Sequence, residues 1–417
     1  MHISQLYTYP IKSLRGVSLS EATLTRTGFQ YDRRFMLLKV ITGENGASTL
    51  KNMHVPDFPE MALFTTDIIY PDEEKDEPGQ IIVTYHPPED KDDRIDDNAA
   101  TLEIPLQPDI RGLRKVSIEM HQSPTTGYDM GAPYNEWFSE RFGYNVVLAY
   151  LGPHSRRVLG SFAPGKSPAH AVDNYKSVVS TRSLVGLAVL TLVLNGVRVS
   201  VSDSASGPMP IQEELLRHWP GVAATVVAAL LSWVLLRMDK KGEEAITFAD
   251  TAPYLLTSET SLDELSARFA GDERMDMSKF RPNIVVSGAA TPFEEDFWAE
   301  LRVGQEARLL LTANCVRCQS INVDYATGKM GTGETGSALK KLMKDRRVDK
   351  GAKYSPVFGR YVFLEPESDK VKVRVGDEVD VLRTMKERMV YGSSSLVQLD
   401  STFKADNFSL DWPGLAN

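Results

Sequence analysis

The chain contains two cysteines, and together they form a single Cys-x-x-Cys motif. Cys315 and Cys318 lie in the stretch NCVRC, in which Arg317 directly precedes Cys318. A neighbouring cation favours the thiolate, which is both a nucleophile and a ligand for soft metals. Two thiols cannot build a disulfide framework, a Cys₄ zinc site or an all-cysteine iron–sulfur cluster within one chain. We therefore expect a reducing compartment.

Four interpretations of this thiol pair are compatible with the sequence. A thioredoxin-like redox pair requires a helix after the first cysteine, whereas residues 319–324 (QSINVD) have the pattern of a strand. The cysteines could instead form half of a zinc site shared between subunits. One thiolate could also bind a redox metal carried by an organic cofactor. The fourth interpretation is a pair of inert side chains in the core.

Basic residues gather beside three expected strands. Residues 10–16 (PIKSLRG) follow the first strand, residues 32–34 (DRR) precede a second, and residues 280–283 (FRPN) precede a third. Cations at strand ends can converge on one anion, although solvated surface charge explains any one of them alone. The combination predicts an anion-binding site.

The composition and the motifs that are missing exclude several classes of protein. Hydrophobic residues make up 42% and charged residues 25% of the 417 residues, as in globular chains of two or three domains. The seven histidines include no His-x-x-x-His pair, which argues against zinc hydrolysis. No Gly-x-Gly-x-x-Gly follows an expected strand. The formal net charge of −9 argues against a nucleic-acid partner.

The pattern of apolar residues predicts the elements that position these groups. Residues 1–150 are expected to be mostly β, with one helix at 134–142, and residues 246–383 to be globular with a helix at 261–269 that begins on a capping box. Acidic loops are expected at 71–79 and 87–98. The expected strands are 2–8, 35–40, 81–85, 246–248, 284–286, 361–365 and 370–374.

Two apolar runs interrupt this pattern at 184–194 and 221–236. Both are shorter than the roughly 20 residues of a spanning helix. Tryptophan near the ends of the second run and cations just beyond it are typical of an interfacial or short transmembrane helix. The alternatives are a buried helix or hairpin of an inserted subdomain, or a gene-model artefact. The N-terminus lacks the pattern of a cleaved signal, so we expect an intracellular protein.

Six stretches together resemble the MOSC superfamily, named for the C-terminal domain of molybdenum-cofactor sulfurase, and within it the mitochondrial amidoxime-reducing component proteins. They are YPIKSLRG (9–16), YDRRFML (31–37), FADTAPYLLTSETSLDEL (248–265), FRPNIVVSG (280–288), NCVRCQSINVDYATG (314–328) and YSPVFGRYVFLE (354–365). The chain departs from that family at Ala252, where a serine is usual. We expect no counterpart of the family's N-terminal anchor in this chain, which instead carries the insertion around 177–240.

The resemblance implies a β-rich α+β fold and a cofactor. It places an N-terminal MOSC-type β-barrel domain at 1–150, a linker and hydrophobic insertion at 151–245, a MOSC β-barrel domain at 246–385 and a tail at 386–417. It implies a molybdenum–molybdopterin cofactor whose metal is bound by Cys318, the catalytic thiolate. The other positions that match cofactor contacts are Lys12, Ser13, Arg34, Thr251, Arg281, Asn283, Arg317 and Tyr361.

The function implied is a molybdenum-dependent oxidoreductase that reduces small N-hydroxylated or N-oxygenated compounds. Electrons would come from a separate b-type cytochrome and its NADH-dependent reductase. Membrane contact through 184–236, at the mitochondrial outer membrane or another cytosol-facing membrane, would replace the family's anchor. The main alternative is a non-catalytic carrier or sulfur-relay module for the molybdenum cofactor, and a structural membrane protein is a third.

Overall fold

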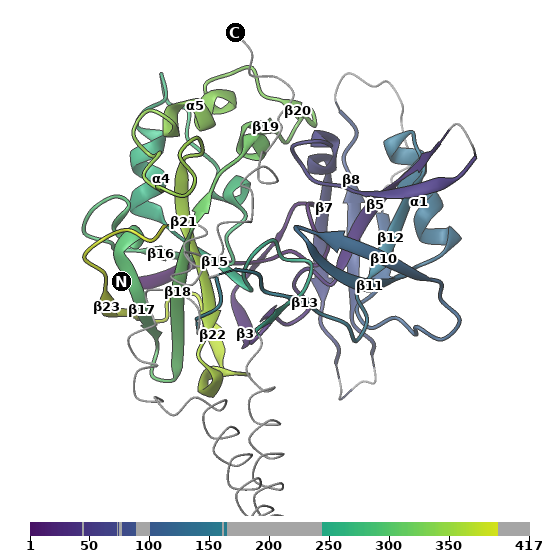
Figure 1. Ribbon diagram of the computed structural model, residues 1–417, viewed down its shortest axis with the longest axis horizontal. Coiled ribbons are helices and arrows are strands. Elements are labelled where there is room, and N and C mark those ends of the chain that lie inside the picture. Colours follow the sequence, from purple (N-terminus) through teal and green to yellow (C-terminus); the bar gives the residue numbers. More distant parts are fainter. Residues whose placement is uncertain are drawn as a thin grey trace, which may run out of the picture. The chain divides into compact units, whose positions relative to one another are not determined.

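The computed structural model describes residues 1–43, 46–72, 74, 77–88, 101–160, 162–164 and 244–390 of the chain (Figure 1). The apolar runs at 184–194 and 221–236 and the tail beyond residue 390 lie outside these residues. In the described part of the chain, no helix is long and apolar enough to cross a membrane. The membrane contact expected for 184–236 therefore stays a prediction.

The largest sheet contains eight strands in the order β2-β1-β16-β15-β21-β18-β17-β23. Its strands are β1 His2–Thr8, β2 Val17–Leu19, β15 Tyr254–Ser258, β16 Ile284–Ser287, β17 Trp298–Val303, β18 Ala307–Val316, β21 Val357–Leu364 and β23 Val379–Thr384. Just before β23, Glu378 bridges to His2, and the amide of Ile3 donates to the carbonyl of Asp377 at 2.9 Å. The sheet therefore nearly closes on itself as a barrel.

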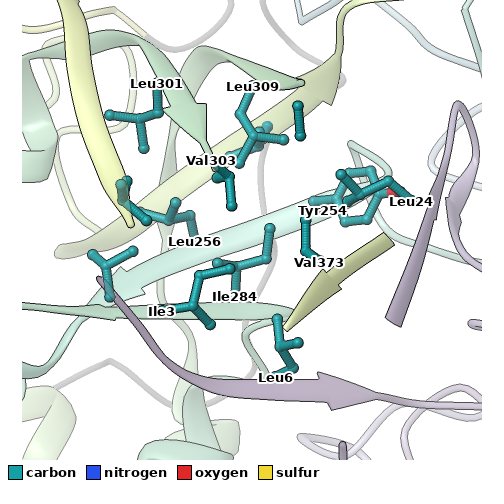
Figure 2. Packing of buried hydrophobic residues seen from close by; sticks show 14 of the residues in the cluster. Ile3, Leu6, Leu24, Tyr254, Leu256, Ile284, Leu301, Val303, Leu309 and Val373 are labelled. Carbon is teal, nitrogen blue, oxygen red and sulfur yellow. The ribbon is translucent and has the colours of Figure 1, made fainter. Parts of the chain in front are cut away.

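The interior of this barrel is a continuous apolar core (Figure 2). Ile3 and Leu6 of β1 belong to the same core as Leu256 of β15 and Ile284 of β16, because β1 has a register shift between Ile3 and Gln5 that turns both side chains inward. Full burial of one such aliphatic side chain contributes about 1.5–3 kcal/mol. The expected strand at 2–8 is confirmed to the residue, and the one at 284–286 is one residue longer.

The N-terminal half forms a second β structure, a half-barrel. Its five-stranded sheet has the order β10-β11-β12-β5-β6, and a three-stranded sheet has the order β7-β8-β9. The strands are β5 Phe35–Thr42, β6 Ser48–Asn52, β7 Phe64–Ile69, β8 Gln80–Tyr85, β9 Thr101–Pro105, β10 Lys115–Met120, β11 Ser123–Asp129 and β12 Val146–Tyr150. One hydrophobic cluster joins the two sheets.

Helix α1, Ala132–Phe142, covers this cluster and confirms the helix expected at 134–142. Phe138 is buried, and Trp137 and Phe142 pack against the same core. The helix ends at Gly143, whose φ of 75° permits its amide to bond to the carbonyl of Ser139 at 2.9 Å.

Strands from the two ends of the sequence pair with one another. The first strand of the chain, β1, pairs with β16, and β3 (Glu21–Thr25) pairs with β22 (Lys372–Arg374) from the other end of the sequence. Strand pairing therefore crosses the boundary between 1–150 and 246–385, and these domain limits stay a prediction. The remaining elements are β4 Gly28–Phe29, β13 Arg156–Arg157, β14 Ala245–Ile246, β19 Val323–Asp324, β20 Lys329–Met330, α4 Glu259–Ser266, α5 Ala338–Leu342 and the 3₁₀ turns η1 Pro59–Leu63, η6 Met277–Phe280, η7 Glu294–Phe297, η8 Gln319–Asn322, η9 Thr335–Ser337 and η10 Pro366–Ser368.

Three local expectations were wrong in detail. The capping box at Ser261 does not start a helix, because β15 runs directly into α4 through Ser258, and the Ser261 hydroxyl is buried and donates to Glu295 at 2.9 Å. Residues 319–322 form the 3₁₀ turn η8 rather than a strand, since Ile321 alone is anchored in the core. The strand expected at 246–248 is displaced to β14 and contains two residues.

Candidate functional site

A hollow on the protein is lined by side chains from four separate segments. They are Ser13, Arg15, Val55, Ala62, Lys279, Arg281, Ser320 and Tyr325. Two of them, Ser13 and Arg281, have a positive φ, of 70° and 56°. This conformation costs non-glycine residues energy and is maintained only where the surrounding structure requires it. Both residues were expected in the site from the sequence, and the fold brings them together.

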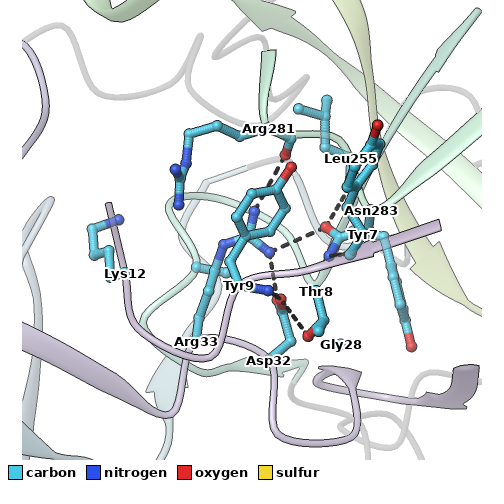
Figure 3. Close-up of polar contacts among 12 residues, drawn as sticks. Tyr7, Thr8, Tyr9, Lys12, Gly28, Asp32, Arg33, Leu255, Arg281 and Asn283 are labelled. Atoms are coloured by element: carbon cyan, nitrogen blue, oxygen red, sulfur yellow. Dashed lines mark hydrogen bonds and ion pairs between the residues drawn. The ribbon is translucent and has the colours of Figure 1, made fainter. Parts of the chain in front are cut away.

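The strands that lead to the hollow are joined by a buried polar network (Figure 3). Asp32 is fully buried, accepts from the Tyr9 amide at 2.8 Å and the Thr8 hydroxyl at 3.3 Å, and forms an ion pair with Arg33. Asp32 thus accepts hydrogen bonds from the residues at the end of β1. These bonds fix the start of the loop that carries Lys12 and Ser13.

Asn283 extends the network to β15 and β16. Its side-chain oxygen accepts from Arg33 at 3.1 Å and from the Leu255 amide at 3.2 Å, and its side-chain nitrogen donates to the Tyr7 carbonyl at 3.2 Å. An amide nitrogen has two hydrogens, so one N–H of Asn283 remains beyond these bonds. Most of what this predicted cofactor residue does is to hold three chain segments together.

Arg281 connects the network to the hollow. Its guanidinium donates to the Leu14 carbonyl at 2.7 Å and lies 4.4 Å from the centre of the Tyr9 ring, a cation–π distance. Burial lowers the pKa of Arg281 from its ordinary value, because a desolvated charge is less favourable.

The two cysteines have different surroundings. Cys315 is 3% exposed and belongs to β18, whereas Cys318 is partly exposed and its Sγ lies 3.2 Å from the Ser320 hydroxyl, which lines the hollow. Both thiols are free. Cys318 is therefore the thiol that borders the hollow, as expected of a metal ligand there.

Arg317 bonds to the other thiol. Its guanidinium donates to Cys315 Sγ at 2.8 Å and to the Phe280 carbonyl. In extended backbone, residues two apart point to the same side, so Arg317 meets Cys315 rather than its sequence neighbour. The sequence shows Arg317 next to Cys318 but did not indicate this hydrogen bond to Cys315.

Lys12 has a partner within the protein that the sequence did not reveal. Its ammonium is buried and forms an ion pair with Asp250, whose Oδ1 also lies 3.5 Å from His121 Nε2. Burial lowers the pKa of Lys12, and the Asp250 charge opposes this shift. Asp250 directly precedes Thr251 in the FADTAPYLL stretch, so that stretch was the available sequence clue.

The other predicted residues do not line the hollow. The Arg34 guanidinium donates to the Gly152 carbonyl, and Tyr361 of β21 is half-buried 6.3 Å from the Phe162 ring. Thr251 is half-buried beside Asp250. The sequence reasoning also missed Arg15, Lys279, Ser320 and Tyr325, although Arg15 belongs to the PIKSLRG stretch.

Two glycine-containing motifs have no nucleotide-binding geometry in the described chain. GTGETG (331–336) follows the two-residue β20, and its first and last glycines pack together so closely that a Cβ on Gly336 would lie 2.2 Å from the Gly331 carbonyl oxygen. GSFAPGKS (160–167) has P-loop spacing but follows β13, a two-residue strand antiparallel to β14, and residues 165–167 lie outside the described residues.

A metal and an organic anion would find different partners here. Within the described residues, no group of three or more His, Cys, Asp or Glu side chains is placed to hold a metal. At the hollow there is instead one partly exposed thiol, which could bind a metal, and several cations, which could bind an anion. This set fits a polyanionic cofactor that brings its own ligands and takes one thiolate from the protein.

His54 gives the region a testable pH dependence. Burial, and then the charge of Lys12, lower the pKa of His54 from 6.5 to about 4. The unfolded chain binds this proton more readily between those values, so the free energy of unfolding should fall as pH falls from 6.5 to about 4. One such proton contributes at most about 1.4 kcal/mol per pH unit. Urea titrations across this range should show a shallower decline for His54→Gln; the same slope as wild type would contradict the assignment.

Comparison with known families agrees with this geometry. Residues 1–145 match the MOSC N-terminal beta barrel domain, and residues 243–380 match the MOSC domain. The chain is a MOSC-domain protein. It is similar to human mitochondrial amidoxime-reducing component 1, with 36% identity over 141 residues, which are 34% of this chain and 40% of the human protein.

Two further relatives give the same result. Rat mitochondrial amidoxime reducing component 2 is 37% identical over 135 residues, 32% of this chain and 38% of the rat protein. Zebrafish (Danio rerio) mitochondrial amidoxime-reducing component 1 is 34% identical over 119 residues, 28% of this chain and 34% of its own length. The chain thus matches about two-fifths or less of these relatives' length. The MOSC domain supports a function related to the molybdenum cofactor.

Proposed function

We propose that this MOSC protein is a molybdenum-cofactor-dependent reductase of N-hydroxylated compounds. The observation that carries the proposal is the partly exposed thiol of Cys318 beside a hollow lined by Arg15, Lys279 and Arg281. A soft thiolate suits molybdenum, and guanidinium and ammonium groups suit the phosphate of a pterin. The relatives' names supply the reaction class, reduction of amidoximes.

The residues of this chain would hold and orient the reactants. Cys318 would bind the metal, and Ser13, Arg281 and the remaining N–H of Asn283 would bind the pterin and its phosphate. The cofactor, when bound, supplies the two-electron chemistry. In the overall reaction the N–O bond of R–NHOH breaks, and two electrons and two protons yield R–NH₂ and water.

The electrons require a second protein. We propose a b-type cytochrome with its NADH-dependent reductase as the donor, and a mitochondrial location as in the relatives' names. Thr251, Arg34, Arg317 and Tyr361 complete the proposed cofactor contacts from the resemblance, with Arg317 acting through its bonds to Cys315 and Phe280.

Metal analysis followed by turnover tests this proposal. The full-length protein should be purified with close to one molybdenum and one pterin per chain, and a reduced viologen dye should then support reduction of an amidoxime. Bound molybdenum without turnover would favour the alternative, a carrier or sulfur-relay role for the cofactor. Protein that takes up no molybdenum cofactor would contradict both functions.

A further inference from the structure

Three cations of the hollow lack an anionic partner. Arg15, Lys279 and Arg281 all line it, and its lining contains no carboxylate. Throughout the described residues, none of the three forms an ion pair: Arg15 and Lys279 contact the Tyr325 ring, and Arg281 bonds to a carbonyl and contacts Tyr9. Three like charges around one hollow repel one another unless an anion binds between them.

The rest of the lining suits an anion as well. The guanidinium of Arg15 lies 4.7 Å and the ammonium of Lys279 5.4 Å from the centre of the Tyr325 ring, so both cations are within cation–π distance of one ring. The hydroxyls of Ser13 and Ser320 also line the hollow; the Ser13 hydroxyl donates to the Met53 carbonyl at 3.4 Å, and the Ser320 hydroxyl lies 3.2 Å from Cys318 Sγ. Burial lowers the pKa of Lys279, and the charges of Asp276, Asp324 and Glu273 oppose this without forming an ion pair.

Two of the cations that match the family's cofactor contacts have partners within the protein. Lys12 is paired with Asp250, and Arg34 donates to the Gly152 carbonyl. Arg15, Lys279 and Tyr325 are outside the set of residues that matched the family's cofactor contacts. Within the described residues, Arg15 and Lys279 thus bring positive charge that forms no ion pair to the hollow that Arg281 also lines.

We propose that Arg15 and Lys279, on the Tyr325 platform and together with Arg281, form an anion subsite for a phosphate or carboxylate group beside Cys318. The group belongs either to the bound cofactor or to an acidic N-hydroxylated substrate. The choice of cofactor or substrate as the source of the anion rests on the proposed function, whereas the existence of the anion site does not.

The first experiment uses inorganic phosphate and needs no activity. Isothermal titration of full-length protein prepared without cofactor should detect phosphate binding, and Arg15→Gln and Lys279→Gln should each weaken it by about 10-fold or more. Lys350→Gln, an exposed charge change elsewhere, is the matched control. Wild-type protein that binds no phosphate, or variants that bind like wild type, would overturn the subsite.

The second experiment identifies the source of the anion in protein loaded with cofactor. Lower molybdenum and pterin content in both variants, but not in Lys350→Gln, assigns the anion to the cofactor. Normal content with a KM raised about 10-fold for a carboxylated benzamidoxime, and unchanged for benzamidoxime itself, assigns it to the substrate. Unchanged content and an unchanged KM ratio would overturn the subsite. If wild-type protein binds phosphate but shows no turnover of either amidoxime, that result would contradict the proposed function and would leave the anion site supported.

Discussion

Cys318→Ser should remove molybdenum from the protein and reduce amidoxime turnover by at least about 100-fold, since changes merely around a ligand cost 10- to 100-fold. A serine hydroxyl is a poor ligand for a soft metal, and the change leaves every buried contact of the core in place. Cys318 is partly exposed, and among the described side chains its thiol has one hydrogen-bonding partner, the Ser320 hydroxyl, so the variant should fold normally. Metal content and turnover are measured on the same preparation.

Cys315→Ser is the matched control for this prediction. Cys315 is buried in β18 and accepts a hydrogen bond from Arg317 at 2.8 Å, which a serine oxygen can also accept. This variant should retain most of its molybdenum and turnover. Equal loss in both variants would instead indicate a redox pair or a metal site that uses both thiols.

Much of the fold could be predicted because hydrophobic periodicity survives in the sequence. The strand at 2–8 alternates between buried and partly exposed residues from Leu6 to Thr8, and α1 keeps its aromatic residues on one side. The prediction failed where tertiary contacts decide. Ser261 has the residue type and spacing of a helix cap, but its buried hydroxyl donates to Glu295 instead of capping a helix.

The site was predictable in part for a similar reason. Residue types identified the thiol pair and the cations near strand ends, and the family resemblance singled out Cys318, but neither showed which cations meet. Which cations meet depends on the turns at Ser13 and Arg281. Their positive φ angles could not be predicted, because serine and arginine rarely adopt them. Lys12 and Arg15 lie three residues apart, yet one pairs with Asp250 and the other lines the hollow.

Asn283→Ala should destabilise the protein rather than only weaken cofactor binding. The change leaves the Leu255 amide and one Arg33 N–H without their acceptor and the Tyr7 carbonyl without one donor. Each buried group left unsatisfied costs about 1–3 kcal/mol, so the free energy of unfolding should fall by roughly 2–5 kcal/mol. Denaturant unfolding of cofactor-free protein measures this without interference from the ligand.

Arg281→Ala separates the two roles of this loop. Its guanidinium bonds to one carbonyl and lines the hollow, so its loss should weaken anion and cofactor binding by about 10-fold or more while costing only about 1 kcal/mol of stability. The two neighbouring variants should thus show opposite profiles, one mainly in unfolding and one mainly in binding. If Asn283→Ala unfolds like wild type but has lost its cofactor, then the network in Figure 3 does not hold the strands together, and Asn283 acts as a ligand to the pterin instead.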